Sequence, residues 1–225
     1  MGKNITHLKE NIEIILNNSQ ALTLQSSKIN NRIEKYLLTA LQIVQERIGR
    51  GDLLDMTYTI VKELCINGAK ANHKRIFFEE EGLNINSQRD YHRGIQLFKK
   101  KFSSAMAEQY GLKAREKGIY IRVFLSFNQD GMHIEVANNT PITPFEESLL
   151  REHMRKGLGY NDIAEYYLEN MDESEGAGLG IALIIILMKG AGIDPLLFRI
   201  FTLPDKTIAR VEIPFQVESP AAIGA

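Results

Sequence analysis

The sequence predicts an α+β fold in which a largely antiparallel sheet is covered by helices on one face. Two observations support this class. Most of the predicted strands are joined by turns, including a hairpin turn at Gln129-Asp130-Gly131. The predicted helices are grouped between the strands, whereas a parallel sheet needs strands and helices that alternate along the chain.

Composition and charge are those of a globular protein. The 225 residues are 44% hydrophobic and 24% charged, and the formal net charge is −1. This balance gives no global field that would draw the chain to nucleic acid or to an anionic membrane. The single cysteine, Cys65, excludes an internal disulfide and a cysteine-built zinc site. Because there is no signal-peptide pattern and the longest apolar run is only residues 181–188, we expect a cytoplasmic protein that does not bind membranes.

The first half of the chain is expected to be mainly helical. Apolar residues at helical spacing predict helices over 5–16 and 31–48, separated by a polar loop at 17–31. Asp52 is a candidate N-cap for a third helix that runs to about residue 72. The apolar residues 76–78 have the composition of a short strand, and residues 88–117 are expected to form one helical segment.

The second half contains most of the predicted sheet. Strands are expected at 119–127 and 132–137, followed by short helices at 144–156 and 161–171, an apolar helix at 180–189, and strands at 196–201 and 209–215. We therefore divide the chain into an N-terminal helical extension (1–51), a main domain (52–216) with a helical insertion at 80–118, and a tail (217–225).

The third predicted helix carries polar groups on one face. At about 100° per residue, Glu63, Asn67 and Lys70 fall within an arc of roughly 60°, and Val61 and Cys65 lie on the opposite side. A carboxylate can orient or deprotonate a water or hydroxyl group, an amide oxygen suits Mg²⁺, and an ammonium group attracts phosphate. The alternative interpretation is the solvated face of an ordinary amphipathic helix.

Two further segments have chemistry that suits a nucleotide. The glycines Gly176, Gly178 and Gly180 precede an apolar helix, and backbone N–H groups in such a loop can approach phosphates closely. A predicted strand leads into Asn138, whose side-chain oxygen can accept a hydrogen bond from an adenine amino group. A hinge or a tight helix entry also explains the glycines, and a plain turn also explains residues 138–141.

Together these segments resemble the nucleotide-binding boxes of the GHKL superfamily of ATPases, which includes histidine kinases, anti-sigma-factor serine kinases, gyrase B and MutL. Residues 63–70 resemble the N box, residues 138–142 the first glycine box, and residues 176–180 the second glycine box. Residues 207–214, which begin with Thr207, resemble the closing strand of histidine-kinase domains. The resemblance covers roughly residues 52–216.

The resemblance implies an α/β sandwich, a mixed sheet backed by helices, that binds ATP and Mg²⁺. It implies that Glu63 is the catalytic base and Asn67 the Mg²⁺ ligand, with residues 143–175 as a lid. The residues implied to bind the nucleotide are Asn67, Lys70, Asn138, Gly176, Gly178, Gly180 and Thr207. The chain departs from the family where Asn138 replaces the usual Asp, and no glycine follows it.

The favoured function is an ATP-binding regulatory protein that transfers phosphate to a separate partner protein or hydrolyses ATP. None of the five histidines is followed by the acidic residue that a histidine-kinase phosphoacceptor usually has. The alternative is a catalytically inactive scaffold that acts through protein–protein binding. The N-terminal helices are candidates for partner docking or homodimerisation, with ordinary packing on the sheet as the other possibility.

The predicted insertion is locally basic. Between Arg89 and Lys117 it has eight Lys and Arg residues but only three acidic ones. This surplus suits an acidic partner or phosphates. Nucleic-acid binding is not expected, because the chain as a whole is nearly neutral.

Overall fold

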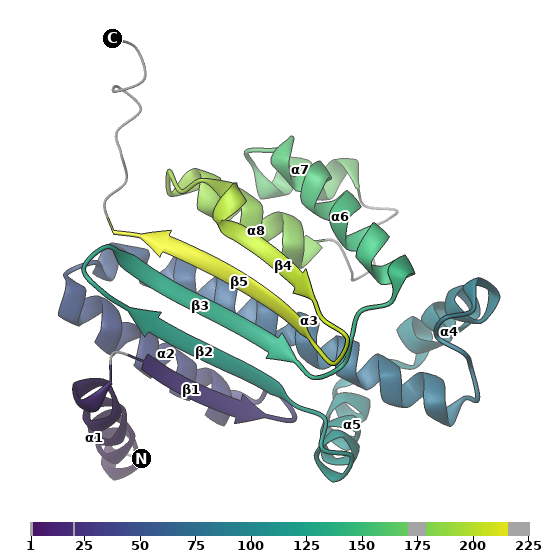
Figure 1. Ribbon diagram of the computed structural model, residues 1–225, viewed down its shortest axis with the longest axis horizontal. Helices are drawn as coiled ribbons and strands as arrows, with labels where there is room; N and C mark the ends of the chain where they lie inside the picture. Colours follow the sequence, from purple (N-terminus) through teal and green to yellow (C-terminus); the bar gives the residue numbers. More distant parts are fainter. Residues whose placement is uncertain (1, 20, 171–178, 216–225) are drawn as a thin grey trace.

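The computed structural model describes residues 2–19, 21–170 and 179–215, which form a five-stranded sheet with helices on one face (Figure 1). The strands lie in the order β1-β2-β3-β5-β4. They are β1 (Ala21–Ser26), β2 (Ile121–Phe127), β3 (Gly131–Asn138), β4 (Phe198–Thr202) and β5 (Thr207–Pro214). The predicted α+β class is therefore confirmed.

Each neighbouring pair of strands in the described ranges is antiparallel, so the mixed sheet implied by the family resemblance is wrong. The pairs β2–β3 and β4–β5 are joined by short turns, which permit only antiparallel pairing. The helical connection from β1 to β2 also joins antiparallel neighbours, whereas the one from β3 leads to β4 on the far side of β5. The largely antiparallel sheet expected from the turns is what forms.

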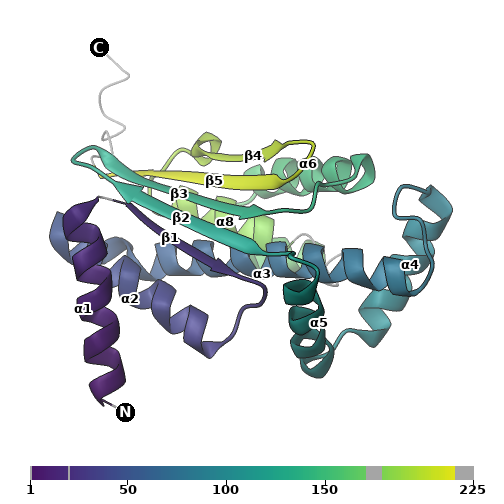
Figure 2. The ribbon, with the colours of Figure 1, turned by 60° about the horizontal axis from the view of Figure 1, so that its bottom comes forward.

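Helices α1 (Gly2–Asn18), α2 (Asn31–Ile48), α3 (Leu54–Glu80) and α8 (Leu179–Gly190) lie beneath the sheet in Figure 2. Side chains in β3 alternate, with Ile134 and Val136 buried against these helices and Glu135 between them on the outer face. This period of two places one face of each central strand in the main core. None of the helices in the described ranges is long and apolar enough to cross a membrane.

The helix boundaries near the N-terminus follow local capping chemistry. The Asn30 side chain accepts a hydrogen bond from the Ile33 backbone N–H at 3.1 Å, and α2 ends at Gly49 in a left-handed conformation with φ of 69°. The expected N-cap at Asp52 is wrong. Asp52 lies in the short 3-10 helix η1 (Gly51–Leu53), and its carboxylate accepts hydrogen bonds from the neighbouring Arg50 guanidinium.

Helix α3 extends beyond the sheet toward α4 (Gln88–Lys101) and α5 (Ser104–Glu116), and the strand expected at 76–78 belongs to this helix (Figure 1). Phe77 and Phe78 are buried because α4 and α5 cover this end of α3. A short apolar run does not by itself distinguish a strand from a fully covered helix. The single helix expected over 88–117 is two helices, since Ser103 caps α5 by accepting from the Met106 N–H.

The polar loop expected at 17–31 contains the edge strand β1, so this expectation is also wrong. Leu22 points into the core while Thr23 is exposed, and the strand pairs with β2 from Ala21 opposite Ser126 to Ser26 opposite Ile121. The polar residues of β1 face solvent, which is why its composition resembled a loop. The segment 1–51 thus adds an edge strand to the sheet as well as two helices.

The segment after β3 forms α6 (Pro144–Leu158) and α7 (Ile163–Glu169), and the 3-10 helix η2 (Pro195–Leu197) precedes β4. A capping box starts α6, in which Thr143 and Glu146 each accept a hydrogen bond from the other's backbone N–H. Helix α6 packs closely on α8, because a Cβ added at Gly157 would lie 3.1 Å from the Cα of Ala182.

Candidate functional site

Helix α3 places the predicted catalytic groups on its less buried face. Val61 and Cys65 are buried, whereas Glu63, Asn67 and Lys70 are partly exposed, as helical periodicity predicts. The helix lies close to the sheet at the neighbouring Gly68, where an added Cβ would be 3.6 Å from Ile121 Cγ1 and 3.8 Å from Asn138 Cβ. This close approach brings the polar face of α3 next to the end of β3.

The start of α8 lies directly against the acid and the amide of α3. A Cβ added at Gly180 would lie 2.6 Å from Oε2 of Glu63 and 3.2 Å from Nδ2 of Asn67. Only a glycine lets the first turn of α8 approach these side chains so closely. The other two glycines of the predicted loop, Gly176 and Gly178, lie outside the described residues.

The Asn67 side chain makes no hydrogen bond within the described residues, and its buried Nδ2 has no partner there. Such a buried donor costs free energy unless a ligand or water supplies an acceptor. Asn67 also lines a large cavity. Its side chain is therefore available to a ligand.

This cavity has a volume of about 900 Å³ and lies between α3, α4 and α6. Its walls include four of the predicted nucleotide-binding residues, namely Asn67, Lys70, Asn138 and Thr207. Asn138 and Thr207 are direct partners in the β3–β5 ladder, so the register of the sheet brings together positions far apart in sequence. Glu63 is not among the lining residues, but a Cβ added at Gly180 would meet both its carboxylate and the amide of the lining residue Asn67.

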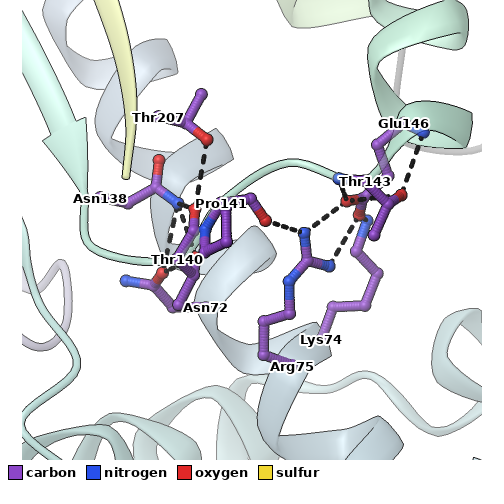
Figure 3. A network of polar contacts seen from close by, with 9 residues as sticks. All are labelled: Asn72, Lys74, Arg75, Asn138, Thr140, Pro141, Thr143, Glu146 and Thr207. Atoms are coloured by element: carbon purple, nitrogen blue, oxygen red, sulfur yellow. Dashed lines mark hydrogen bonds and ion pairs between the residues drawn. The ribbon is translucent and has the colours of Figure 1, made fainter. Parts of the chain in front are cut away.

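Asn138 belongs to a buried polar network at the end of β3 (Figure 3). Its Nδ2 donates hydrogen bonds to Thr140 Oγ1 at 2.7 Å and to the Thr140 carbonyl oxygen at 3.0 Å. Thr140 Oγ1 in turn donates to Asn72 Oδ1 at 2.8 Å, and Thr207 Oγ1 donates to the Thr140 carbonyl oxygen at 3.2 Å. These bonds fix the orientation of the Asn138 amide.

The network leaves the Asn138 side-chain oxygen as an unused acceptor. Oδ1 accepts no hydrogen bond from the described residues, and in Figure 3 it points away from Thr140 and Asn72. Thr140 faces the network and is not among the cavity-lining residues. The acceptor that the sequence suggested for an adenine amino group is therefore free at the cavity wall.

A second polar cluster lies at the first turn of α6, where Glu146 forms ion pairs with Lys74 and Arg75 of α3 (Figure 3). Arg75 also donates to the Pro141 carbonyl oxygen at 2.7 Å. Although burial raises it, the hydrogen bond from Arg75 and the charge of Lys74 together lower the pKa of Glu146 to about 2. Burial lowers the pKa of Lys74, against the opposing effect of Glu146.

Sequence reasoning missed this cluster and Asn72. Lys74 continues the spacing of Glu63, Asn67 and Lys70 along one face of α3, and the Thr143–Glu146 pattern is a capping-box signature. Both signals were visible. Neither indicated that the capping carboxylate would also meet two cations of another helix.

The charged residues around the cavity favour an anionic ligand. Its basic lining residues are Lys70, Lys74, Arg75 and Lys99, and its acidic ones are Glu146 and Glu152. Glu146 is shared by two of these cations, and Glu152 pairs with Lys156 at 3.2 Å. Lys70 and Lys99 form no ion pair within the described part of the chain. Two unneutralised ammonium groups on opposite helices create a positive local potential.

The described residues contain no group of three or more His, Cys, Asp or Glu that could hold a metal ion. A dedicated protein cage for Mg²⁺ is therefore not found in these ranges. Mg²⁺ is commonly bound through one or two protein oxygens together with substrate phosphates and water. The available oxygen of Asn67 fits that arrangement.

A curated protein is similar in sequence to most of this chain. An uncharacterized protein of Treponema pallidum (strain Nichols) is 31% identical over 183 residues, which cover 81% of this chain and 36% of the relative. The chain thus spans about a third of the length of the curated relative that it matches. No family model matches the chain. No solved structure matches it either.

Proposed function

We propose that this chain binds ATP with Mg²⁺ and either transfers phosphate to a partner protein or hydrolyses the nucleotide. The observation that supports this most strongly is the composition of the cavity. Asn67, Lys70, Asn138 and Thr207 were singled out on sequence grounds, and all four line one cavity of about 900 Å³. Ligand pockets of small molecules and cofactors have volumes in this range, roughly 300–1,000 Å³.

The proposed mode of binding assigns a different contact to each end of the cavity. The free Oδ1 of Asn138 accepts from the adenine amino group, and apolar side chains such as Ile142 and Ile181 contact the base. Lys70 attracts the phosphates, and the first turn of α8 adds favourable partial positive charge. Asn67 supplies an oxygen ligand to Mg²⁺, whose charge would offset that of the phosphates.

Glu63 is the proposed general base. Its carboxylate lies beside Asn67 at the start of α8, so it adjoins the place assigned to the phosphates. From there it can orient a water molecule or a partner hydroxyl group and accept its proton. Whether the acceptor is water or a partner protein depends on what can reach this end of the cavity.

One observation favours the alternative of an inactive scaffold. The segment after Asn138 is tightly held, because Asn139 Oδ1 accepts from the Tyr120 N–H at 2.7 Å and Arg75 holds the Pro141 carbonyl oxygen. Without glycines, this segment has less freedom to adjust to a base. The scaffold hypothesis predicts no nucleotide binding and a function carried by other surfaces.

Thermal unfolding with Mg·ATP, Mg·ADP and Mg·GTP separates the two hypotheses. A ligand at about 100 times its Kd stabilises the folded state by about 2.7 kcal/mol, which raises Tm by several degrees for a chain of this length. We expect a shift that is specific to adenine nucleotides and requires Mg²⁺. No shift at millimolar nucleotide concentration would refute ATP binding.

Asn67→Ala tests the metal assignment. The variant is expected to fold normally, because the amide has no hydrogen bond to lose within the described residues, but it should lose the Mg²⁺-dependent part of the shift. Asn161→Ala is the matched control, since Asn161 is exposed and is not a lining residue of the cavity. Equal Mg²⁺-dependent shifts in both variants would contradict the role of Asn67.

A further inference from the structure

The insertion between α3 and β2 forms one wall of the cavity. Helix α4 contributes Tyr91, His92, Ile95, Gln96, Phe98 and Lys99 to its lining. The opposite walls come from α3 and α6, and from the strand ends at Asn138 and Thr207. A ligand in the cavity would therefore touch the insertion as well as the sheet and α3.

Close packing holds α4 in this position. Gly94 lies so near α3 that an added Cβ would collide with the ring of Phe78, and the ring centres of Phe77 and Phe98 are 5.4 Å apart. The Lys74 ammonium lies 5.7 Å from the centre of the Tyr91 ring. Helix α4 is thus fixed against the part of α3 that lines the cavity, and its side chains form a defined wall.

Three of the eight basic residues between Arg89 and Lys117 form ion pairs with the end of α3. Acidic residues at the end of α3 pair with three lysines of the insertion: Glu81 with Lys101 at 2.6 Å, Glu80 with Lys113, and Glu79 with Lys117 at 2.8 Å. These pairs attach the insertion to α3. They also neutralise these three lysines, which reduces the positive charge that the insertion could offer to an acidic macromolecule.

Lys99 differs from these lysines. It lines the cavity and forms no ion pair or hydrogen bond with any described residue. Lys70 lines the α3 wall of the same cavity, and its ammonium group likewise forms no ion pair or hydrogen bond with any described residue. The neighbouring Lys100 is also exposed, but it is not among the residues that line the cavity.

We propose that Lys99 binds the phosphate groups of the ligand from α4, opposite Lys70, and that ligand binding thereby attaches the insertion to the nucleotide site. The proposal rests on the proposed function in that it concerns the same cavity, but it requires only a phosphate-bearing ligand. An ammonium group on a flexible stem reaches a phosphate as a point charge. Bound ligand then joins α3 and α4 in addition to their direct packing.

The test compares Lys99→Gln with Lys100→Gln, which remove the same charge from adjacent exposed positions. Binding of Mg·ATP and, separately, of inorganic tripolyphosphate is measured by calorimetry. We expect Lys99→Gln to weaken binding about three- to tenfold, and Lys100→Gln less than about twofold. Hydrogen exchange of the α4 amides should slow with ligand in the wild-type chain, and this effect should be smaller in Lys99→Gln.

The outcomes distinguish the two proposals. Tripolyphosphate binding that depends on Lys99, without any preference for adenine nucleotides, would support the role of Lys99 and refute the proposed ATP function. Mg·ATP binding that is equal in both variants would refute the role of Lys99 and leave ATP binding standing. If the wild-type chain binds neither ligand, both proposals are overturned.

Discussion

Glu146→Gln tests how much the charge cluster at the first turn of α6 stabilises the fold. The Glu146 carboxylate is 8% exposed and bridges Lys74 and Arg75 of α3. Glutamine keeps the length of the side chain and can still accept the capping hydrogen bond from the Thr143 N–H. The substitution therefore removes the negative charge that pairs with two cations on α3.

The expected magnitude follows from the pKa of Glu146, which is lowered from 4.5 to about 2. Since one pKa unit is worth about 1.36 kcal/mol, this corresponds to about 3 kcal/mol of stability at pH 7. Loss of one partner from a buried ion pair costs a similar amount, about 3–5 kcal/mol. Because the folded-state pKa is lowered, the contribution is complete above about pH 4.5, falls to about 1.4 kcal/mol at pH 3, and is lost below about pH 2.

The assay is urea unfolding of the wild-type chain and the variant at pH 7 and at pH 3. Glu147→Gln is the matched control, because Glu147 pairs with Arg151 on the surface of the same helix, where an i,i+4 pair is worth only about 0.3–0.5 kcal/mol. A difference for Glu146→Gln below about 1 kcal/mol at pH 7, or one that does not shrink at pH 3, would refute this reasoning.

Two further predictions concern the contact between α8 and α3 and a buried histidine of α3. Gly180→Ala should displace the Glu63 carboxylate and lower nucleotide turnover at least about tenfold, while the free energy of unfolding changes by less than about 1 kcal/mol. Gly190→Ala is the control, and equal turnover in the two variants would contradict this prediction. Burial lowers the pKa of His73 from 6.5 to about 4, so the free energy of unfolding of the wild-type chain should fall by about 3 kcal/mol as the pH is lowered from 6.5 to 4. Urea unfolding of His73→Leu should show no such decline. An unchanged decline in this variant would exclude His73 as its source.

Where a feature depends on neighbours in the chain, the sequence was sufficient. Helix α2 spans Asn31–Ile48 as predicted, and the β2–β3 hairpin formed around its polar turn. The separation of the polar and buried faces of α3 also followed from its sequence. Each depends on a backbone period or a turn preference that a few consecutive residues determine.

The errors arose where burial came from distant segments. Phe77 and Phe78 formed part of a helix because α4 and α5 cover them, and the edge strand β1 exists because β2 offers it a partner. The family resemblance implied a mixed sheet, but the described strands pair only in the antiparallel direction. Such outcomes depend on which elements pack together, which local composition does not specify.

The sequence by itself determined which side chains carry the relevant chemistry, because Glu63, Asn67 and Lys70 share a helix face through the helical period alone. Only the tertiary structure placed Asn138 and Thr207 beside that face, through the register of β3 and β5. The ion pairs of Glu146 and the position of Lys99 on the opposite wall were equally beyond the sequence. Spacing within one element follows from backbone geometry, whereas the approach of separate elements depends on the packing of the whole core.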